Sequence, residues 1–537
     1  MGFTDWLLKP LGWLFARHPQ WRDAYGRSIM WLGIRFYWVL GLILALAGAW
    51  SLIWHPFDNQ FAHESFDLLM RHRPIAYSAD PDVVVLDIDE ASLAAMNAQY
   101  GRWPWPRQVL ARVAQRLERA QARAVVFDIL FADPDIANPQ SEADFDQYVL
   151  GSRHSFFPAV RLSPLNDSAS DIALSMLKFA QPDPEAISEK INGRHTVAIM
   201  TPYFNSIYES ARVGTSNIYP DADHTVRWYP SYEKVAGYRI PSLPFRVAEL
   251  LQWPLPRHAR NLINWPNGIS PYRTFSFASI LNAANRSDDA YFRQFANKVV
   301  VVGSTAPDLG DIKSTPVDSA YPGIYVLATV LDNTKNARFL QPLNPWLIWC
   351  LELLMLGGSA LLFSYTNQAL TIAKYFFAVP VALFSISLLS VSTSNWLVDL
   401  SVPAALVLAY FTFGKVFDTN VRDFIAGTGP FTATADEAAG RLQIACLPPA
   451  TRREEVLQYL TRRGSMIKLW EPDAGGFGRH WVDQGWVLWR WHADAASGDD
   501  ESALCWIEVP GPAAAAGGFA VAEAIAAASK TMRERPE

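Results

Sequence analysis

Acidic side chains lie at the ends of two short apolar runs in the first quarter of the chain. Asp87 and Asp89 close the run VVVLDID at residues 83–89, and Asp128 lies in AVVFDILF at 124–131. An Asp-x-Asp pair after a strand can supply a nucleophile and a proton carrier for phosphoryl transfer. The same carboxylates can instead line a ligand site, so their place in the fold decides between the two chemistries.

A loop rich in tryptophan and proline, RWPWPR, separates the two runs. Proline fixes φ and restricts the residue before it, so Trp103 and Trp105 are expected in stiff, extended backbone. Two interpretations stay open. The loop is either a rigid cap whose indoles cover a core, with Arg107 neutralising Asp89 or Asp128, or a preformed surface for a ligand or partner.

Short continuous apolar runs predict strands that are buried on both faces. They cover residues 83–89, 124–131, 196–200 and 298–303. Residues 106–120, between the first two runs, have the apolar spacing of a helix. Strand, helix and strand in this order indicate a βαβ unit with parallel strands, so we expect an α/β domain.

In open α/β sheets, ligands bind beyond the carboxyl ends of the strands. The acidic and aromatic residues described above follow or end such strands. We therefore expect a ligand site at this edge of the sheet, formed by Asp87, Asp89, Trp103, Trp105, Arg107, Asp128, Asp133 and Asp311.

Hydrophobic residues make up 50% of the 537 residues and charged residues only 18%, and the apolar excess is concentrated in a few runs. Such runs can cross a bilayer as helices. The net charge of −6 and the lack of a basic stripe argue against a nucleic-acid partner. We predict four transmembrane helices, at residues 36–54, 345–363, 375–391 and 396–414.

Basic residues are concentrated before the first span, and this bias sets the predicted orientation. It places residues 1–35 and 415–537 in the cytoplasm and residues 55–343 outside the cytoplasmic membrane of a bacterium. Part of 1–35 could form a helix on the membrane surface. Glu352 and Asp399 are ionisable residues within the predicted spans, which makes them functional candidates. Asp399 is only a few residues from the outer end of its span, so we expect it at the membrane interface. Glu352 could equally serve packing beside Gly357, Gly358 and Ser359.

The three cysteines, Cys350, Cys446 and Cys505, have no spacing typical of a metal site. None lies in residues 55–343, so that region has no disulfide. We predict neither a metal nor another cofactor.

The outer region resembles the CHASE type 2 domain (cyclases/histidine kinases associated sensory extracellular). The residues that carry the resemblance are LDIDEASL at 86–93, RWPWPR at 102–107, FDILFADPD at 127–135, and VVVGSTAPDLGDIKSTPVDSAYPGIYV at 300–326. One span before the domain and three after it are also similar to the family. The resemblance covers about residues 60–415 and implies an extracytoplasmic sensor. Leu327-Ala328 replaces a frequent His-Ala pair, and residues 136–195 match nothing in the pattern, which predicts a variable insertion.

Such proteins usually continue into a cyclase or kinase, but residues 416–537 contain none of the motifs of these enzymes. After a linker at 415–440, the pattern predicts a small α+β domain, with strands at 441–447, 485–491 and 503–509 and helices at 452–463 and 520–532. Its dense tryptophans either build a small core or dock a partner. Trp486, Trp489 and Trp491 are the candidates for a docking face.

The sequence thus predicts a noncatalytic, multi-pass receptor, with an α/β sensor, four transmembrane helices and a small cytoplasmic domain. Its predicted partners are the lipid bilayer, a small molecule or periplasmic protein at the sensor, and a cytoplasmic or membrane protein at the output. A homodimer or a larger complex is expected. One alternative is a scaffold subunit of an envelope complex. Another is a phosphohydrolase that uses Asp87 and Asp89, although Ala91 stands where such enzymes carry threonine.

Overall fold

The computed structural model describes residues 35–54, 60–365 and 369–426, except for 187–190, 205, 207–210, 257, 269 and 310, together with residues 25, 28 and 32 and three strands in the tail. The chain divides into two compact units. The α/β unit contains residues 60–343 and 386–399. The helical unit contains most of the apolar helices and the strands of the tail.

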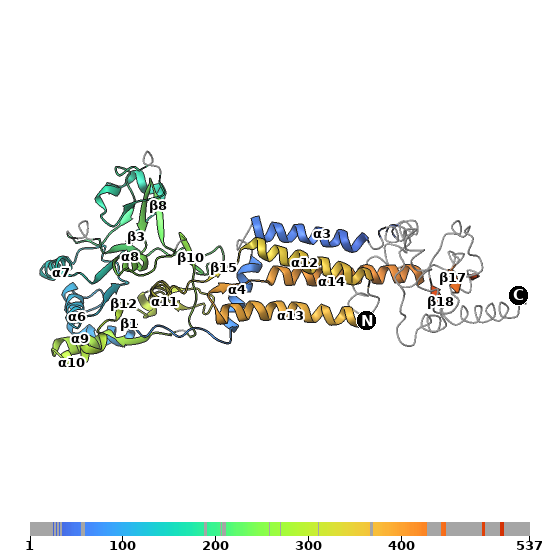
Figure 1. Ribbon diagram of the computed structural model, residues 1–537. Coiled ribbons are helices and arrows are strands. Elements are labelled where there is room, and N and C mark those ends of the chain that lie inside the picture. The colour runs from blue at the N-terminus through green and yellow to red at the C-terminus, as the bar shows by residue number, and fades with distance from the viewer. Residues whose placement is uncertain are drawn as a thin grey trace, which may run out of the picture. The chain divides into compact units, whose positions relative to one another are not determined.

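A seven-stranded sheet forms the centre of the α/β unit (Figure 1). Its order is β11-β1-β12-β2-β3-β5, and β6 also pairs with β3. All pairings are parallel except that of β3 with β5. The bounds are β1 Val83–Asp87, β2 Ala124–Phe127, β3 Ser155–Arg161, β5 Ile199–Met200, β6 Val213–Thr215, β11 Arg273–Ser276 and β12 Val299–Gly303.

Three of the predicted runs form strands, and β1 and β2 are parallel as expected; of the run at 196–200 only Ile199 and Met200 form a strand, and Met200 is exposed. However, β12 lies between them in the sheet. All residues of β1, β2 and β12 are buried, because helices cover both faces of the sheet. This burial explains why these strands read as continuous apolar runs rather than as alternating ones.

Helices pack on the two faces of this sheet. On one face, α5 (Glu90–Tyr100), α6 (Arg107–Arg119), α7 (Pro139–Gly151) and α9 (Phe277–Asn285) share a core with alternate strand residues such as Val84, Val125 and Val300. On the other, α11 (Gly323–Lys335) contacts β1 and β12, and α8 (Leu243–Leu250) contacts β3 and β6. The predicted helix at 106–120 is α6.

One expectation about this unit needs correction, and one helix was not predicted. The tryptophan loop lies in the connection between β1 and α6 as expected, but the unpredicted helix α5 stands between β1 and the loop. Residues 136–195, expected to be an insertion, contain α7 and β3. Because β3 pairs with β2 and its hydrophobic side chains are buried in the core, this segment is an integral part of the sheet.

Smaller elements complete the α/β unit. The short helices and strands are α4 Gln60–His72, α10 Asp289–Phe292, β4 Gln181–Pro182, β7 Trp228–Pro230, β8 Tyr232–Val235, β9 Tyr238–Pro241, β10 Arg260–Leu262, β13 Ile312–Lys313, β14 Tyr321–Pro322, β15 Gln341–Pro342 and β16 Trp396–Leu397. The 3-10 turns are η2 Pro164–Ala169, η3 Leu174–Met176, η6 Arg293–Phe295 and η7 Pro307–Leu309.

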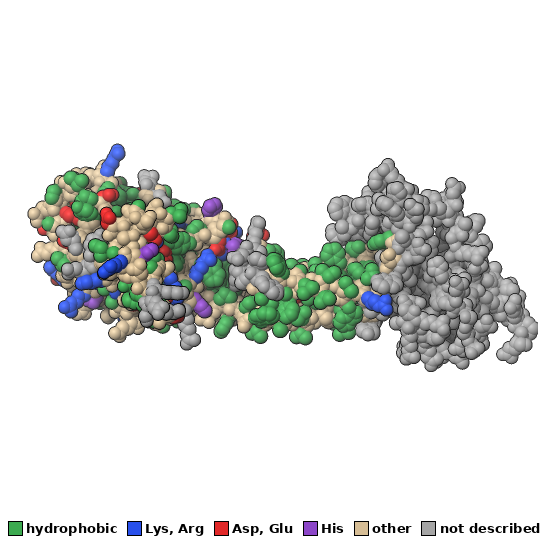
Figure 2. All heavy atoms as spheres, turned by 90° about the horizontal axis from the view of Figure 1, so that it is seen from above, with side chains coloured by type: hydrophobic (Ala, Val, Ile, Leu, Met, Phe, Trp, Pro, Cys, Tyr) green, Lys and Arg blue, Asp and Glu red, His purple; other side chains and the backbone are tan. Residues whose placement is uncertain are grey.

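Four helices in the described residues are long and apolar enough to cross a membrane. They are α3 Arg35–Ala49, which continues as the π-helix η1 Trp50–Trp54, α12 Pro345–Tyr365, α13 Ala369–Thr393 and α14 Ser401–Ala426. Figure 2 shows hydrophobic side chains over the visible surface of these helices.

The predicted start of the last span at residue 396 is wrong. Trp396 and Leu397 form β16, which pairs with β15, and α14 begins only at Ser401. In the sequence, these two apolar residues look like the start of a span. In the structure, they instead form a strand that pairs with β15.

The tail contains a three-stranded antiparallel sheet of order β18-β17-β19. Its strands are β17 Leu442–Cys446, β18 Trp486–Leu488 and β19 Cys505–Val509, each inside a predicted range. Trp489 and Trp491 lie outside the described residues. The same is true of the predicted tail helices at 452–463 and 520–532, and of the surface helix expected before residue 25.

Candidate functional site

The tryptophan loop packs into the core beside α9. The Trp105 side chain is 3% exposed, and its ring centroid lies 5.5 Å from that of Phe277 and 5.0 Å from that of Trp103. Trp103 is partly buried against the same core, and the peptide bond between Trp103 and Pro104 is cis. This packing favours the interpretation in which the indoles cap a core.

Arg107 is buried and pairs with α7. Its Nη1 lies 2.5 Å from Oε1 of Glu142, and its Nη2 donates to the carbonyl oxygen of Asp133. Burial lowers the pKa of Arg107, and Glu142 opposes that shift. The expected pairing of Arg107 with Asp89 or Asp128 is therefore wrong, because its carboxylate partner comes from the segment that was expected to be an insertion.

Asp87 and Asp89 both accept hydrogen bonds from the surrounding fold. Asp87 is 6% exposed and accepts from the backbone N–H and the hydroxyl of Thr305, at 2.8 and 2.6 Å. Burial raises the pKa of Asp87. Asp89 caps the N-terminus of α5 by accepting from the N–H of Ser92 at 2.7 Å. In the described part of the chain, no three His, Cys, Asp or Glu side chains are grouped so that they could hold a metal ion.

Asp128 and Asp311 form a second acidic pair at the carboxyl edge of the sheet. Burial, and then the nearby Asp311, raise the pKa of Asp128 to about 7, while Lys313 opposes the shift. Lys313 Nζ lies 2.9 Å from Oδ1 of Asp311, whereas the Asp128 carboxylate accepts no hydrogen bond from the described residues. Burial and these two carboxylates also raise the pKa of Tyr229, which is 1% exposed. We call Asp128, Asp311, Lys313 and Tyr229 the acidic group.

Helix α11 begins at the acidic group. The N–H of Gly323, its first residue, donates to the carbonyl oxygen of Asp311 at 2.8 Å. The Asp311 carboxylate also lies so close to Gly323 that a Cβ there would overlap it. A carboxylate at a helix N-terminus is favoured by the helix dipole. Every residue of α11 from Gly323 to Thr334 is buried.

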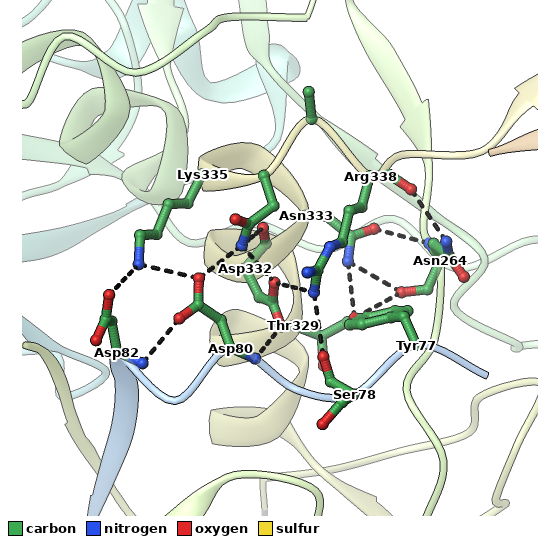
Figure 3. A network of polar contacts seen from close by, with 12 residues as sticks. Tyr77, Ser78, Asp80, Asp82, Asn264, Thr329, Asp332, Asn333, Lys335 and Arg338 are labelled. Atoms are coloured by element: carbon green, nitrogen blue, oxygen red, sulfur yellow. Dashed lines mark hydrogen bonds and ion pairs between the residues drawn. The ribbon is translucent and has the colours of Figure 1, made fainter. Parts of the chain in front are cut away.

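The other end of α11 carries a dense polar network (Figure 3). Asp332 is fully buried and accepts from the N–H of Asp80 at 2.9 Å, from the Tyr272 hydroxyl at 3.2 Å and from Arg338 at 3.2 Å. Burial nevertheless raises the pKa of Asp332. We call the following residues the α11 network: Tyr77, Ser78, Asp80, Asp82, Asn264, Asp332, Asn333, Lys335, Asn336 and Arg338.

The network holds the chain segment that leads into β1. The Asn333 amide donates to the Tyr77 hydroxyl at 3.0 Å, and Lys335 lies 2.9 Å from Asp80 and 2.8 Å from Asp82. Sequence reasoning missed these residues. In the sequence, polar residues at the end of a helix are typical of an exposed helix end. Only the fold shows that residues 77–82, 264 and 332–338 contact one another.

Arg73 extends the network towards α13. It is 5% exposed, and its Nη1 donates to Asn264 Oδ1 at 2.7 Å and to the carbonyl oxygen of Val391 at 3.5 Å. Burial lowers the pKa of Arg73 to about 10. Val391 lies in the last turns of α13, where a cation is favourable because the helix dipole is negative.

Asp399 lies outside the described helices. It is 8% exposed, it precedes α14, and its Oδ1 accepts from the hydroxyl of Ser65 in α4 at 3.2 Å. It was expected at the membrane interface, near the outer end of a span, because Trp396 and Leu397 extended the apolar run.

Glu352 lies within the helical unit, where it packs against Gly48 of α3. It is fully buried, and a Cβ at position 48 would overlap its carboxylate. Neither carboxylate oxygen has a hydrogen-bond partner within the described residues. The expected neighbours Gly357 and Gly358 are not involved, because a Cβ at either would meet nothing within 4 Å. Glu352 therefore belongs to the contact of α12 with α3.

These features define a class of protein: a membrane protein that combines a parallel α/β domain with four apolar helices. The family model of the CHASE2 domain matches residues 39–364, which is more than half of the chain. The chain therefore belongs to the CHASE2 domain family, an extracellular sensory domain family. The match includes residues 136–195. No curated protein and no solved structure matches the chain.

Proposed function

We propose that the chain is a receptor of a bacterial cytoplasmic membrane, in which α11 transmits a signal from the acidic group to the segments that lead into the apolar helices. The observation that carries this proposal is the position of α11. Its first residue contacts Asp311, and its last turn holds the α11 network. One fully buried helix thus joins the expected ligand edge to the opposite end of the domain.

At the acidic group, a small molecule or periplasmic protein would act through charge. Asp128 has no hydrogen-bond donor in the described residues, and Asp311 has Lys313 as its ion-pair partner. A bound cationic or hydrogen-bonding group would change the repulsion between the two carboxylates. It would favour one position of α11 only to the extent that it binds that position more tightly.

At the α11 network, the segments next to the apolar helices are held together. Arg73 follows α4, the helix that comes after the first span, and bonds to Asn264 and Val391. The Asn395 amide donates to the carbonyl oxygen of Ala337, just after α11, at 3.1 Å. Strand β15, before α12, pairs with β16, before α14. A shift of the last turn of α11 would therefore reach every one of these segments.

The N-terminus and the tail would both lie on the cytoplasmic side of the membrane. The tail would have no catalytic activity of its own and would contact a protein partner. The basic residues before α3 support this orientation. The tryptophans of the tail, among them Trp486 in β18, support a docking role. A homodimer or larger complex would bring two tails to the partner.

The proposal is tested by neutralising the acidic group and observing the far end of the domain. Spin labels are placed at the exposed positions Ile75 and Thr393, in full-length protein whose native cysteines are replaced by serine. The double variant Asp128→Asn/Asp311→Asn should shift the distance between the labels by about 1–2 Å, the usual size of a helix shift.

The matched control removes two exposed aspartates of the same unit, Asp144→Asn/Asp171→Asn, and should leave the distance unchanged. The same distance distribution in wild type and in the acidic-group variant would show that α11 does not transmit.

A further inference from the structure

A concave surface lies between α6 and the end of α9. These helices cover one face of the sheet, whereas α11, which begins at the acidic group, covers the other. The volume of the concave surface is about 280 Å³. It is lined by Arg112, Gln115, Arg116 and Arg119 of α6, and by Ala284, Asn285 and Ser287 at and just after the end of α9. We call it the arginine pocket.

The helical repeat of α6 brings the arginines together. Residues three and four positions apart share one face of a helix, so Arg112, Arg116 and Arg119 are neighbours. The opposite face of α6, with Val113 and Leu117, is buried in the core. The packing of α6 therefore fixes the direction of the arginine face.

The charges in the pocket are not balanced. Arg116 Nη1 lies 3.1 Å from Oδ1 of Asp289, whose side chain is 87% exposed. Glu118 is turned into the fold, where it accepts from the Tyr148 hydroxyl at 2.9 Å. The Arg119 side chain has no hydrogen bond or ion pair with any described residue. The pocket thus carries two positive charges in excess.

Hydrogen-bond donors also exceed acceptors in the pocket. Arg112 Nη1 donates to Asn285 Oδ1 at 2.8 Å, and Arg116 Nη2 donates to the Ser287 hydroxyl. These bonds occupy the Asn285 acceptor but leave its amide N–H groups and most guanidinium N–H groups available. Planar guanidinium groups match the oxygens of carboxylates and phosphates.

We propose that the arginine pocket binds a small polyanion that carries carboxylate or phosphate groups. The volume of about 280 Å³ lies near the lower end of small-molecule sites, which is about 300 Å³, so it suits a compact ligand rather than a polymer. This inference goes beyond the proposed signalling role and does not depend on it, because the binding is measured directly.

The test uses full-length protein in detergent and isothermal titration with citrate or inorganic phosphate, against sodium chloride of equal ionic strength. Citrate, phosphate or both should bind saturably, and the anion that binds identifies the preferred group. Arg112→Gln/Arg119→Gln should weaken binding at least about tenfold, since each substitution removes charge-assisted hydrogen bonds to the anion. Gln115→Trp should weaken it similarly, because the indole fills the pocket while all arginines remain.

The control Arg153→Gln/Arg194→Gln removes the same charge from exposed positions that do not line the pocket, and should bind like wild type. Three results would overturn the proposal: no saturable binding of either anion, an equal loss of binding in both double variants, or wild-type binding by Gln115→Trp. The last two would indicate a general attraction of anions to the positive surface. Unfolding temperatures of all variants are measured beside the titrations, so that a loss of binding is assigned only to folded protein.

Discussion

The two ends of α11 differ in how their polar groups are satisfied. At its N-terminus, the Asp128 carboxylate accepts no hydrogen bond from the described residues, and the Asp311 carboxylate is paired with Lys313. At its C-terminus, Asp332 is fully buried and accepts from several donors. A satisfied buried network specifies a single arrangement, whereas carboxylates without donors are open to an added partner. The same helix thus has one end built for rigidity and another that can respond.

The largest effect is expected when the α11 network is broken. Asp332→Ala leaves the Tyr272 hydroxyl, the Asp80 N–H and the Arg338 guanidinium without their acceptor. It should destabilise the protein by roughly 3–5 kcal/mol, because each buried donor that loses its acceptor costs about 1–3 kcal/mol. Urea unfolding in detergent, followed by tryptophan fluorescence, measures the loss.

Asp289→Ala is the control, since it removes an exposed carboxylate that pairs with Arg116. Such exposed pairs contribute only about 0–1 kcal/mol. If both substitutions had the same small effect, the C-terminal end of α11 would not be the rigid one.

A smaller effect is expected when one hydroxyl is removed from the same network. Tyr77 donates to the carbonyl oxygen of Asn264 at 3.1 Å and accepts from Asn333. Tyr77→Phe should cost about 1–3 kcal/mol, because the buried Asn333 amide loses an acceptor. Tyr203→Phe, at a side chain that is 57% exposed, should leave the unfolding midpoint unchanged. If Tyr77→Phe left the unfolding free energy unchanged, the α11 network would not depend on each of its hydrogen bonds.

The smallest effect is expected at the acidic group, and it depends on pH. The pKa of Asp128 is raised from 3.8 to about 7 in the folded protein, so the folded state binds the proton more tightly than the unfolded state. Wild type should therefore lose stability as the pH rises from about 4 to 7, and Asp128→Asn should not show this contribution. Because the side chain is partly exposed, solvent screens the interaction. We therefore expect Asp128→Asn to be more stable than wild type by only about 1 kcal/mol at pH 8 and equal to wild type near pH 4.

Thermal unfolding across this pH range, with Asp171→Asn as the exposed control, measures the difference. A constant offset between Asp128→Asn and wild type at every pH would contradict a raised pKa at this position.

The sequence was sufficient for the parts of the fold that depend on local apolar pattern. β1, β2 and β12 are buried on both faces and therefore appear as unbroken runs, and α6 shows the spacing of a helix with one buried face. The spans were also recognised by apolar length. The start of α14 was not, because Trp396 is apolar in a strand as it would be in a span.

The candidate site was harder to predict because its contacts are long-range. Arg107 is buried in the fold, yet Glu142 could not be named as its partner before α7 was placed. Asp332 and Asn333 carry no periodic signal, and their roles depend on segments that lie far away in the chain. Local pattern identifies elements, whereas the pairing of polar groups depends on how those elements are brought together.

The close approach of Gly48 to Glu352 has a consequence for evolution. Position 48 has no room for even a methyl group while a carboxylate as long as that of Glu352 lies against it. A bulkier residue at 48 would become acceptable only after the side chain at 352 had shortened. Substitutions at the two positions are therefore expected to be correlated: a relative with a larger residue at position 48 should have a shorter one at position 352.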